Sequence, residues 1–87
     1  MEFLFKDEAE DDLAFWHRNS KSKIRKIESL LKSMKETPFS GIGHPEVLKE
    51  NLAGYWSRRI DKEHRIIYKV DNEFITIFSL RGHYFDK

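Results

Sequence analysis

The sequence contains no cysteine, only two prolines and four glycines, and no long run of apolar residues. Without cysteine the chain cannot form disulfides, use a thiolate nucleophile, or bind zinc or an iron–sulfur cluster through sulfur. A small domain without disulfides is typical of a reducing compartment. No segment approaches the roughly 20 apolar residues of a membrane span. Residues 1–16 are acidic, unlike a signal peptide. We therefore expect a cytoplasmic protein that does not enter a membrane.

The chain is also short, with 87 residues, which excludes a large enzyme with a separate cofactor domain. Hydrophobic residues make up 39% and aromatic residues 14%, enough for a compact core. The charges nearly cancel, 16 basic against 15 acidic, so the composition is not that of a disordered chain. We expect one domain over residues 1–87.

The small net charge of +1 conceals two segments of opposite sign. Residues 1–16 carry one lysine and six acidic side chains, whereas residues 17–36 carry seven basic and two acidic ones. The basic segment is consistent with a surface for a polyanion. It is equally consistent with the solvated side of a helix, and charge alone does not decide between them.

Hydrophobic periodicity predicts the order β-α-α-β-β-β. Apolar residues at spacings of three and four indicate a helix over about 8–18 and a second one between a cap at Asn19-Ser20 and a stop at Thr37-Pro38. A short aromatic strand is expected at 2–5, and alternating patterns predict strands at 55–60, 64–70 and 73–81. Residues 38–54, which hold both prolines and three of the glycines, are expected to form a long loop.

These elements predict an α+β fold, with an antiparallel sheet and both helices packed on one face. A two-residue turn at Asp71-Asn72 would place Val70 opposite Glu73. One face then carries the apolar side chains that the helices cover: Ile66, Tyr68, Ile75 and Ile77. The other carries Arg65, Ile67, Lys69, Phe74, Thr76 and Phe78, a mixture of polar and aromatic groups. We expect the functional site on this second face.

Residue types that can cleave RNA gather after residue 44. Attack by a 2′-hydroxyl needs a base for its proton and an acid for the leaving 5′-oxygen. It also needs cations for the phosphate, and arginine can bind two phosphate oxygens at once. The segment supplies these types: Glu46, Lys49, Arg58, Arg59, His64, Arg65, Arg81, His83 and Tyr84. On spacing alone, ordinary surface roles for Glu46, Arg65 and His83 remain open.

Several motifs in order resemble the YoeB/Txe toxins. They are PEVLKENLAGYWSRRI at 45–60, HRIIY at 64–68, RGHY at 81–84, and Thr37-Pro38-Phe39 followed by Gly41-x-Gly43. The resemblance covers essentially the whole chain. The sequence departs from the family pattern only in the tail Phe85-Asp86-Lys87, which extends beyond the usual His-Tyr ending.

This resemblance implies a small RelE-like domain of the RelE/ParE superfamily. It implies a toxin of a type II toxin–antitoxin system that cleaves mRNA in the ribosomal A site and stops translation, without a metal or cofactor. The implied partners are mRNA, the bacterial ribosome with its rRNA, and a YefM/Axe-like antitoxin. A homodimer is expected, and operator DNA is expected to be contacted only through the antitoxin.

The resemblance also assigns roles residue by residue. Glu46 would be the general base, His83 the general acid, and Arg65 would stabilise the pentacoordinate phosphorane. Lys49 and Arg59 would hold flanking phosphates, and Tyr84 would position the substrate. The expected products are a 2′,3′-cyclic phosphate and a 5′-hydroxyl.

Other residues have structural interpretations. Arg58 points away from Arg59 on a strand, which favours a structural ion pair, and His64 is expected to hold a turn. His17 and His44 are expected at the surface, and four scattered histidines argue against a metal site. Trp16 and Trp56 are expected to pack on the sheet, and stacking on a base is the alternative for Trp56.

Two functions of other classes remain open. The same fold would serve a non-catalytic, ParE-like inhibitor of gyrase, since fold does not fix function. A small RNA-binding module is the third possibility, based on the basic helix and the aromatic strands. With a ribosome as partner, the basic helix is expected to contact ribosomal RNA.

Overall fold

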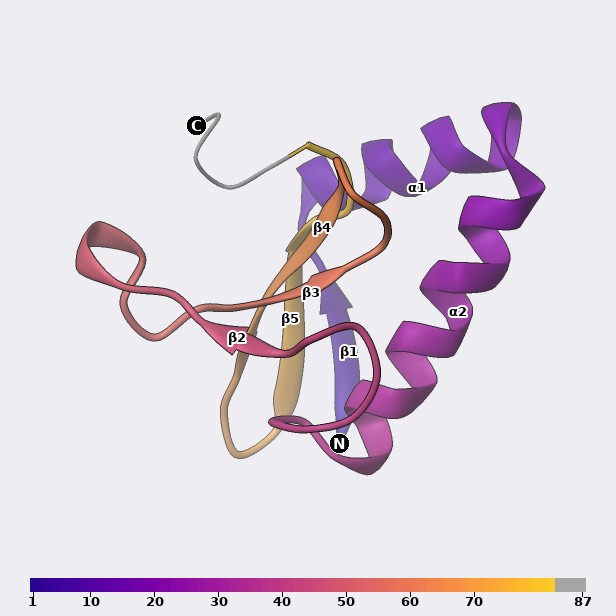
Figure 1. Ribbon diagram of the computed structural model, residues 1–87. Coiled ribbons are helices and arrows are strands. Elements are labelled where there is room, and N and C mark those ends of the chain that lie inside the picture. The colour runs from indigo at the N-terminus through magenta and orange to yellow at the C-terminus, as the bar shows by residue number, and fades with distance from the viewer. Residues whose placement is uncertain (83–87) are drawn as a thin grey trace.

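In the computed structural model of the protein, residues 1–82 are described (Figure 1). His83 and Tyr84, which carry two of the predicted roles, and the tail residues 85–87 lie outside the described part. The elements are β1 (Glu2–Phe5), α1 (Asp7–Asn19), α2 (Lys21–Glu36), β2 (Glu46–Val47), the short 3₁₀ helix η1 (Glu50–Leu52), β3 (Trp56–Arg59), β4 (Arg65–Val70) and β5 (Phe74–Ser79).

The strands form one five-stranded sheet in the order β1-β5-β4-β3-β2. The predicted α+β class is confirmed, but the expectation of a fully antiparallel sheet is wrong, because β1 pairs with β5 in parallel. Strands β2 to β5 are antiparallel neighbours, so only the first strand departs from the pattern. The helical excursion through α1 and α2 separates β1 from the other strands and allows this direction, which hydrophobic periodicity does not encode.

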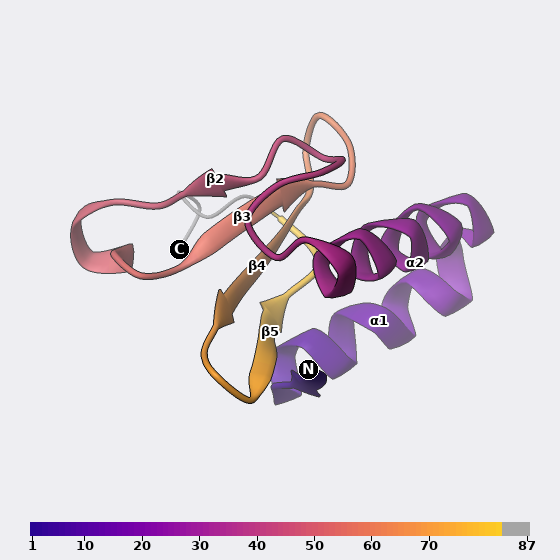
Figure 2. The ribbon, with the colours of Figure 1, turned by 90° about the horizontal axis from the view of Figure 1, so that it is seen from below.

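Both helices lie on the same side of the sheet, as the view in Figure 2 shows. The α2 side chains Ile27, Leu30 and Met34 are fully buried, as expected for an amphipathic helix whose apolar residues recur every three or four positions. The sheet side chains predicted to face the helices are also fully buried: Ile66, Tyr68, Ile75 and Ile77. The core therefore sits between the helices and this face, and the second face of the sheet is left for other functions.

The hairpin between β4 and β5 has a longer turn than predicted. Val70 is paired with Ile75, not with Glu73. The Asp71 carboxylate accepts hydrogen bonds from the backbone N–H groups of Glu73 and Phe74, both at 2.8 Å, and this closes a wider turn. Over 68–70 the register differs from the prediction by two residues, an even number, so these side chains keep their predicted faces. Between Ile67 and Tyr68 the register shifts by one more residue, so that Ile67 is paired with Ser79.

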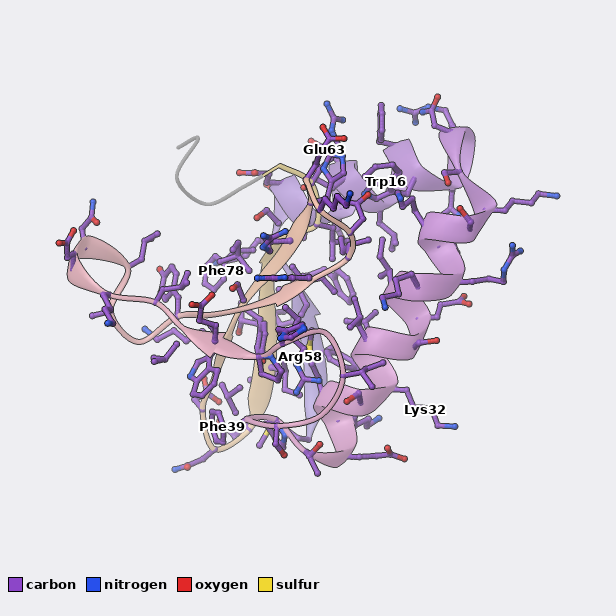
Figure 3. All side chains as sticks on the ribbon, in the orientation of Figure 1. Trp16, Lys32, Phe39, Arg58, Glu63 and Phe78 are labelled. Atoms are coloured by element: carbon purple, nitrogen blue, oxygen red, sulfur yellow. The ribbon has the colours of Figure 1, made fainter. Side chains whose placement is uncertain are left out.

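Arg58 organises the loop between α2 and β2. Its side chain is fully buried and points from β3 toward this loop (Figure 3). The predicted structural role is supported, but the predicted ion pair is not, since among residues 1–82 every hydrogen-bond acceptor of its guanidinium is neutral. All five N–H donors are used, by the Tyr68 hydroxyl, the Ser33 hydroxyl, and the carbonyl oxygens of Thr37, Ser40 and Ile42, at 2.7–3.1 Å.

The Tyr68 hydroxyl links this cluster to the core. It accepts a hydrogen bond from Arg58 Nε at 3.0 Å and donates one to the Pro38 carbonyl at 3.2 Å. Burial raises the pKa of Tyr68 above its ordinary value, and the neighbouring guanidinium offsets only part of that effect. The phenol therefore stays protonated and keeps its donor for the loop.

Candidate functional site

Glu46 is held by the edge strand β2, within the segment predicted to be an irregular loop. That prediction was incomplete, because β2 has only two residues and η1 only three, too few to give a periodic signal. Glu46 is paired with Ser57 of β3, so the two residues share a face of the sheet. The Glu46 side chain is exposed and its carboxylate is open to solvent and to a ligand.

Arg59 and Arg65 lie directly opposite each other on β3 and β4. Residues in this relation have Cβ atoms about 4.5–5.5 Å apart, and like charges there repel. Arg59 is exposed, while Arg65 is half-buried and donates through Nη1 to the Asp61 carbonyl at 2.9 Å. An anion bound beside the two arginines would offset this repulsion, and arginine is a side chain that can bind two phosphate oxygens at once.

Glu46 and Arg59 line the same open cavity of about 210 Å³, together with His44 and Pro45. The alternation along β3 also puts Arg59 on the same face as Ser57, the partner of Glu46. A carboxylate that can accept a proton therefore lies beside a cation that can bind a phosphate. Sequence reasoning placed His44 at the surface, which is confirmed, but did not anticipate that it would line this cavity.

Lys49 is less closely associated with this cavity. It is exposed at the start of η1, three residues beyond Glu46, and its carbonyl accepts a hydrogen bond from Leu52 N at 3.1 Å. It is not among the described residues that line the cavity. As an exposed residue shortly after β2, it is a candidate for contact with a longer ligand rather than with the cavity itself.

The segment that leads to His83 is firmly attached to the sheet and to α1. The N–H of Gly82 donates to His64 Nδ1 at 2.9 Å, and its carbonyl accepts from Arg65 N at 3.0 Å. His64 thus holds more than the β3–β4 turn that was predicted for it, and its ring also meets Trp16 edge-on at a centroid distance of 4.9 Å.

Leu80 is fixed in the same way, from α1. Its N–H donates to the Asp12 carboxylate and its carbonyl accepts from Trp16 Nε1, both at 2.9 Å. The predicted packing role of Trp16 is confirmed, since it is buried in the core cluster. The roles predicted for His83 and Tyr84 fall outside the described residues and stay predictions.

The turn before β4 is stabilised by an ion pair with α2. Lys23 Nζ lies 2.6 Å from an Asp61 carboxylate oxygen, and the other oxygen accepts from the N–H groups of Glu63 and His64. Burial opposes ionisation of Asp61, but the hydrogen bonds from Lys23 and the two backbone amides outweigh it and lower the pKa of this carboxyl. Asp61 therefore fixes the turn before Arg65 both to α2, through Lys23, and to the turn's own backbone, through the amides of Glu63 and His64.

Trp56 lies on the face toward the core, opposite Tyr68, and its ring meets that of Phe39 at a centroid distance of 5.0 Å. Its packing role is confirmed. The alternation that turns Trp56 toward the core brings its neighbour Tyr55 to the other face, where the Tyr55 ring stacks on that of Phe78 with centroids 4.9 Å apart and an angle of 15°. Sequence reasoning missed this pair, although the period of two places Tyr55 on the face of Ser57 and Arg59.

The second face of the sheet thus combines a carboxylate, a pair of opposed arginines and an aromatic pair. This set can bind a phosphate and accept a proton beside it. Within residues 1–82 no group of three or more side chains is arranged as a metal site. In the same part of the chain, no helix is long and apolar enough to span a membrane.

Comparison with known proteins gives a consistent result over nearly the whole chain. The family model described as YoeB-like toxin of bacterial type II toxin-antitoxin system matches residues 5–84. Toxin YoeB of Escherichia coli strain K12 is 43% identical over 84 residues, which covers 97% of this chain and 100% of that protein.

Solved structures of similar toxins have the same fold as this chain. The YoeB/ParE toxin from Agrobacterium tumefaciens superimposes with a TM-score of 0.93 at 41% identity, over 97% of this chain and 100% of that one. The YoeB dimer from Staphylococcus aureus gives a TM-score of 0.90 at 44% identity, over 97% and 98% of the two chains. The heterotetrameric YoeB-YefM complex from the same organism gives 0.88 at 44% identity, over 94% and 95%.

Proposed function

Because this chain belongs to the YoeB-like toxins of bacterial type II toxin–antitoxin systems, we propose that it is a ribosome-dependent endoribonuclease that cleaves mRNA in the A site and so inhibits translation. The observation that carries the proposal is the second face of the sheet. Glu46 and Arg59 line one open cavity there, and Arg65 lies opposite Arg59 on the neighbouring strand. A carboxylate beside two opposed cations suits a phosphodiester with an adjacent hydroxyl.

In the proposed reaction, the Glu46 carboxylate accepts the proton of the 2′-hydroxyl. The 2′-oxygen attacks the neighbouring phosphorus, and the bond from phosphorus to the 5′-oxygen breaks. His83 donates a proton to that leaving oxygen, and Tyr84 positions the substrate. The products are a 2′,3′-cyclic phosphate and a 5′-hydroxyl, so atoms and protons balance without an oxidant or an added cofactor.

The arginines supply the electrostatic part of this mechanism. Negative charge builds on the phosphoryl oxygens as the phosphorane forms, and Arg65 is proposed to stabilise it. Arg59 and Lys49 are proposed to hold the flanking phosphates. Arg59 and Arg65 lie opposite each other, so the negative charge of the bound phosphates would also offset the repulsion between the two cations.

The proposed partners follow from the family and from surface charge. A YefM/Axe-like antitoxin is proposed to cover the second face of the sheet, with its arginines Arg59 and Arg65. The toxin is proposed to form a homodimer and to contact operator DNA only through the antitoxin. A Staphylococcus aureus relative has been solved both as a dimer and with YefM. The outward side of α2 is proposed to contact ribosomal RNA in the cytoplasm, through its exposed basic side chains Lys21, Arg25, Lys26, Lys32 and Lys35.

The test is cleavage of a defined message on programmed bacterial ribosomes, compared with the naked message. Glu46→Gln removes the base but keeps the size of the side chain, and it should slow cleavage by roughly 10²–10⁴-fold. Glu50→Gln is the matched control, a second exposed acid four residues away that does not line the cavity. Equal rates for Glu46→Gln and wild type would refute the assigned role. Intact message together with gyrase-dependent DNA damage would instead support the ParE-like alternative.

A further inference from the structure

The aromatic pair Tyr55–Phe78 has no part in the mechanism above. The two rings are stacked almost parallel, with centroids 4.9 Å apart and an angle of 15°. Both side chains are only half-buried. They lie outside the core cluster between the sheet and the helices, and Phe78 is on the side of the sheet away from α2 (Figure 3). A half-buried aromatic stack outside the core cluster calls for an explanation beyond core packing.

A bulge in β5 brings Phe78 into this position. Tyr68 is paired with Ile77 and Ile67 with Ser79, so Phe78 is an extra residue between two pairs. Such bulges commonly re-aim a side chain next to a functional site. Tyr55 is fixed from the other side, because its carbonyl accepts from Leu48 N at 2.9 Å just before β3 begins. Two independent backbone features thus assemble the stack.

The pair lies in line with the proposed phosphate site. Along β3 the residues Tyr55, Ser57 and Arg59 alternate onto the same face, and two residues of a strand span about 6.5 Å. Ser57 is the partner of Glu46, and Arg59 is the partner of Arg65. Along β3 the order is therefore the aromatic ring of Tyr55, then Ser57 with the Glu46 carboxylate on the neighbouring strand β2, and then Arg59 with Arg65 on β4. This spacing resembles that of neighbouring units in an extended RNA strand.

The chemistry around the rings also suits a nucleotide. Lys69 Nζ lies 5.3 Å from the centre of the Tyr55 ring, so a cation accompanies the aromatic surface. Aromatic rings beside basic side chains are the usual means of binding single-stranded nucleic acid, because every base has a flat face that can stack. Rings and cations on one face therefore favour a single-stranded nucleic acid over a purely apolar partner.

We propose that the Tyr55–Phe78 pair is a stacking subsite for one nucleobase of the message, on the same face of the sheet as Glu46 and the arginines Arg59 and Arg65. This inference rests on the proposed function, since it takes RNA as the substrate of the same face. Because stacking tolerates all four bases, the subsite contributes affinity and placement rather than a strict sequence code.

The test uses a message with 2-aminopurine at the codon in the A site, a base whose fluorescence falls when it stacks. Ribosomes programmed with this message are mixed with the Glu46→Gln protein, so that no cleavage intervenes. We expect a fall in fluorescence that is lost with Tyr55→Leu and with Phe78→Leu in the same background. Phe39→Leu is the control, because Phe39 is a 54% exposed aromatic residue whose ring packs at a tilt against Trp56, away from the Tyr55–Phe78 pair. Cosedimentation verifies that each variant binds the ribosome.

In the catalytically intact protein, Tyr55→Leu should lower the cleavage rate at limiting toxin on the order of 5- to 100-fold. Tyr55→Phe keeps the ring and should restore it. An undiminished fall in fluorescence with both leucine variants would overturn the subsite, as would a loss confined to antitoxin binding. If wild type binds programmed ribosomes without cutting, the proposed function fails, while the fluorescence still decides whether a base stacks on these rings.

Discussion

Replacement of Arg58 should unfold the loop that leads to the site, and should do so far more severely than replacement of its neighbour. Arg58 is fully buried on β3 and uses all five of its donors, whereas Arg59 is exposed on the opposite face. The two residues are adjacent and chemically identical, so Arg58→Met and Arg59→Met form a matched pair. We expect the difference in unfolding free energy to come almost entirely from burial and hydrogen bonding.

The magnitude follows from what the acceptors do after the change. Five hydrogen bonds to a charged group at about 1.5–3 kcal/mol each would sum to about 8–15 kcal/mol, as large as the whole stability of roughly 4–13 kcal/mol expected for a domain of this size. The carbonyls of Thr37, Ser40 and Ile42 belong to exposed residues, however, and can bind water instead. We therefore expect Arg58→Met to cost about 3–5 kcal/mol, the usual cost of breaking a buried charged network.

Urea denaturation followed by circular dichroism measures this difference directly. Arg59→Met should change stability by less than about 0.5 kcal/mol, as surface substitutions usually do. Arg58→Lys keeps the charge with three donors instead of five, and should fall between wild type and Arg58→Met. If Arg58→Met and Arg59→Met unfold within about 1 kcal/mol of each other, the account of Arg58 as the organiser of the loop is wrong.

Two further predictions concern the same loop and the turn that carries Arg65. Gly43→Ala should destabilise the protein by about 1–3 kcal/mol more than Gly54→Ala. Both glycines have positive φ, but a Cβ at Gly43 would lie 2.5 Å from Leu30 Cδ2, whereas at Gly54 the nearest atom is 3.9 Å away. Thermal unfolding of the two variants measures the difference. Asp61 has a pKa below its ordinary value of 3.8, so its contribution is present above that pH and is lost as the pH falls through the lowered folded value. Asp61→Asn should therefore be less stable at neutral pH and lose less stability on acidification, and parallel unfolding curves for the two proteins between pH 5 and 2 would contradict this.

Local patterns in the sequence predicted most of the fold. The apolar spacing of α2 and the alternation in β4 and β5 place Ile27, Tyr68 and Ile77 in the core, because periodicity reports which face is buried. The pairing partner of Val70 could not be predicted from the sequence pattern, because the Asp71 carboxylate accepts hydrogen bonds from two backbone amides and this widens the turn. The parallel direction of β1 could not be predicted from periodicity either, since it depends on how the helices pack.

The candidate site divides in the same way. The convergence of Arg59 and Arg65 follows from a hairpin that the sequence predicts, and their direct pairing agrees with it. The strand that holds Glu46 was missed because two residues carry no period. Arg58 was expected to form an ion pair with an acidic side chain, but three of its hydrogen bonds go to backbone carbonyls of an irregular loop. Backbone acceptors cannot be predicted from a pattern of side chains, because every residue has a carbonyl.

The central claim is that the second face of the sheet cleaves RNA through the 2′-hydroxyl of the message. The most direct test is a message with a single 2′-deoxynucleotide at the scissile position, bound to programmed ribosomes and compared with the all-ribose message. The account predicts a cut in the A-site codon of the ribose message, with a 2′,3′-cyclic phosphate and a 5′-hydroxyl at the new ends, and no cut at the deoxy position. Cleavage of the deoxy message at the same site and rate would contradict it, because the nucleophile would then not be the group that Glu46 is proposed to deprotonate.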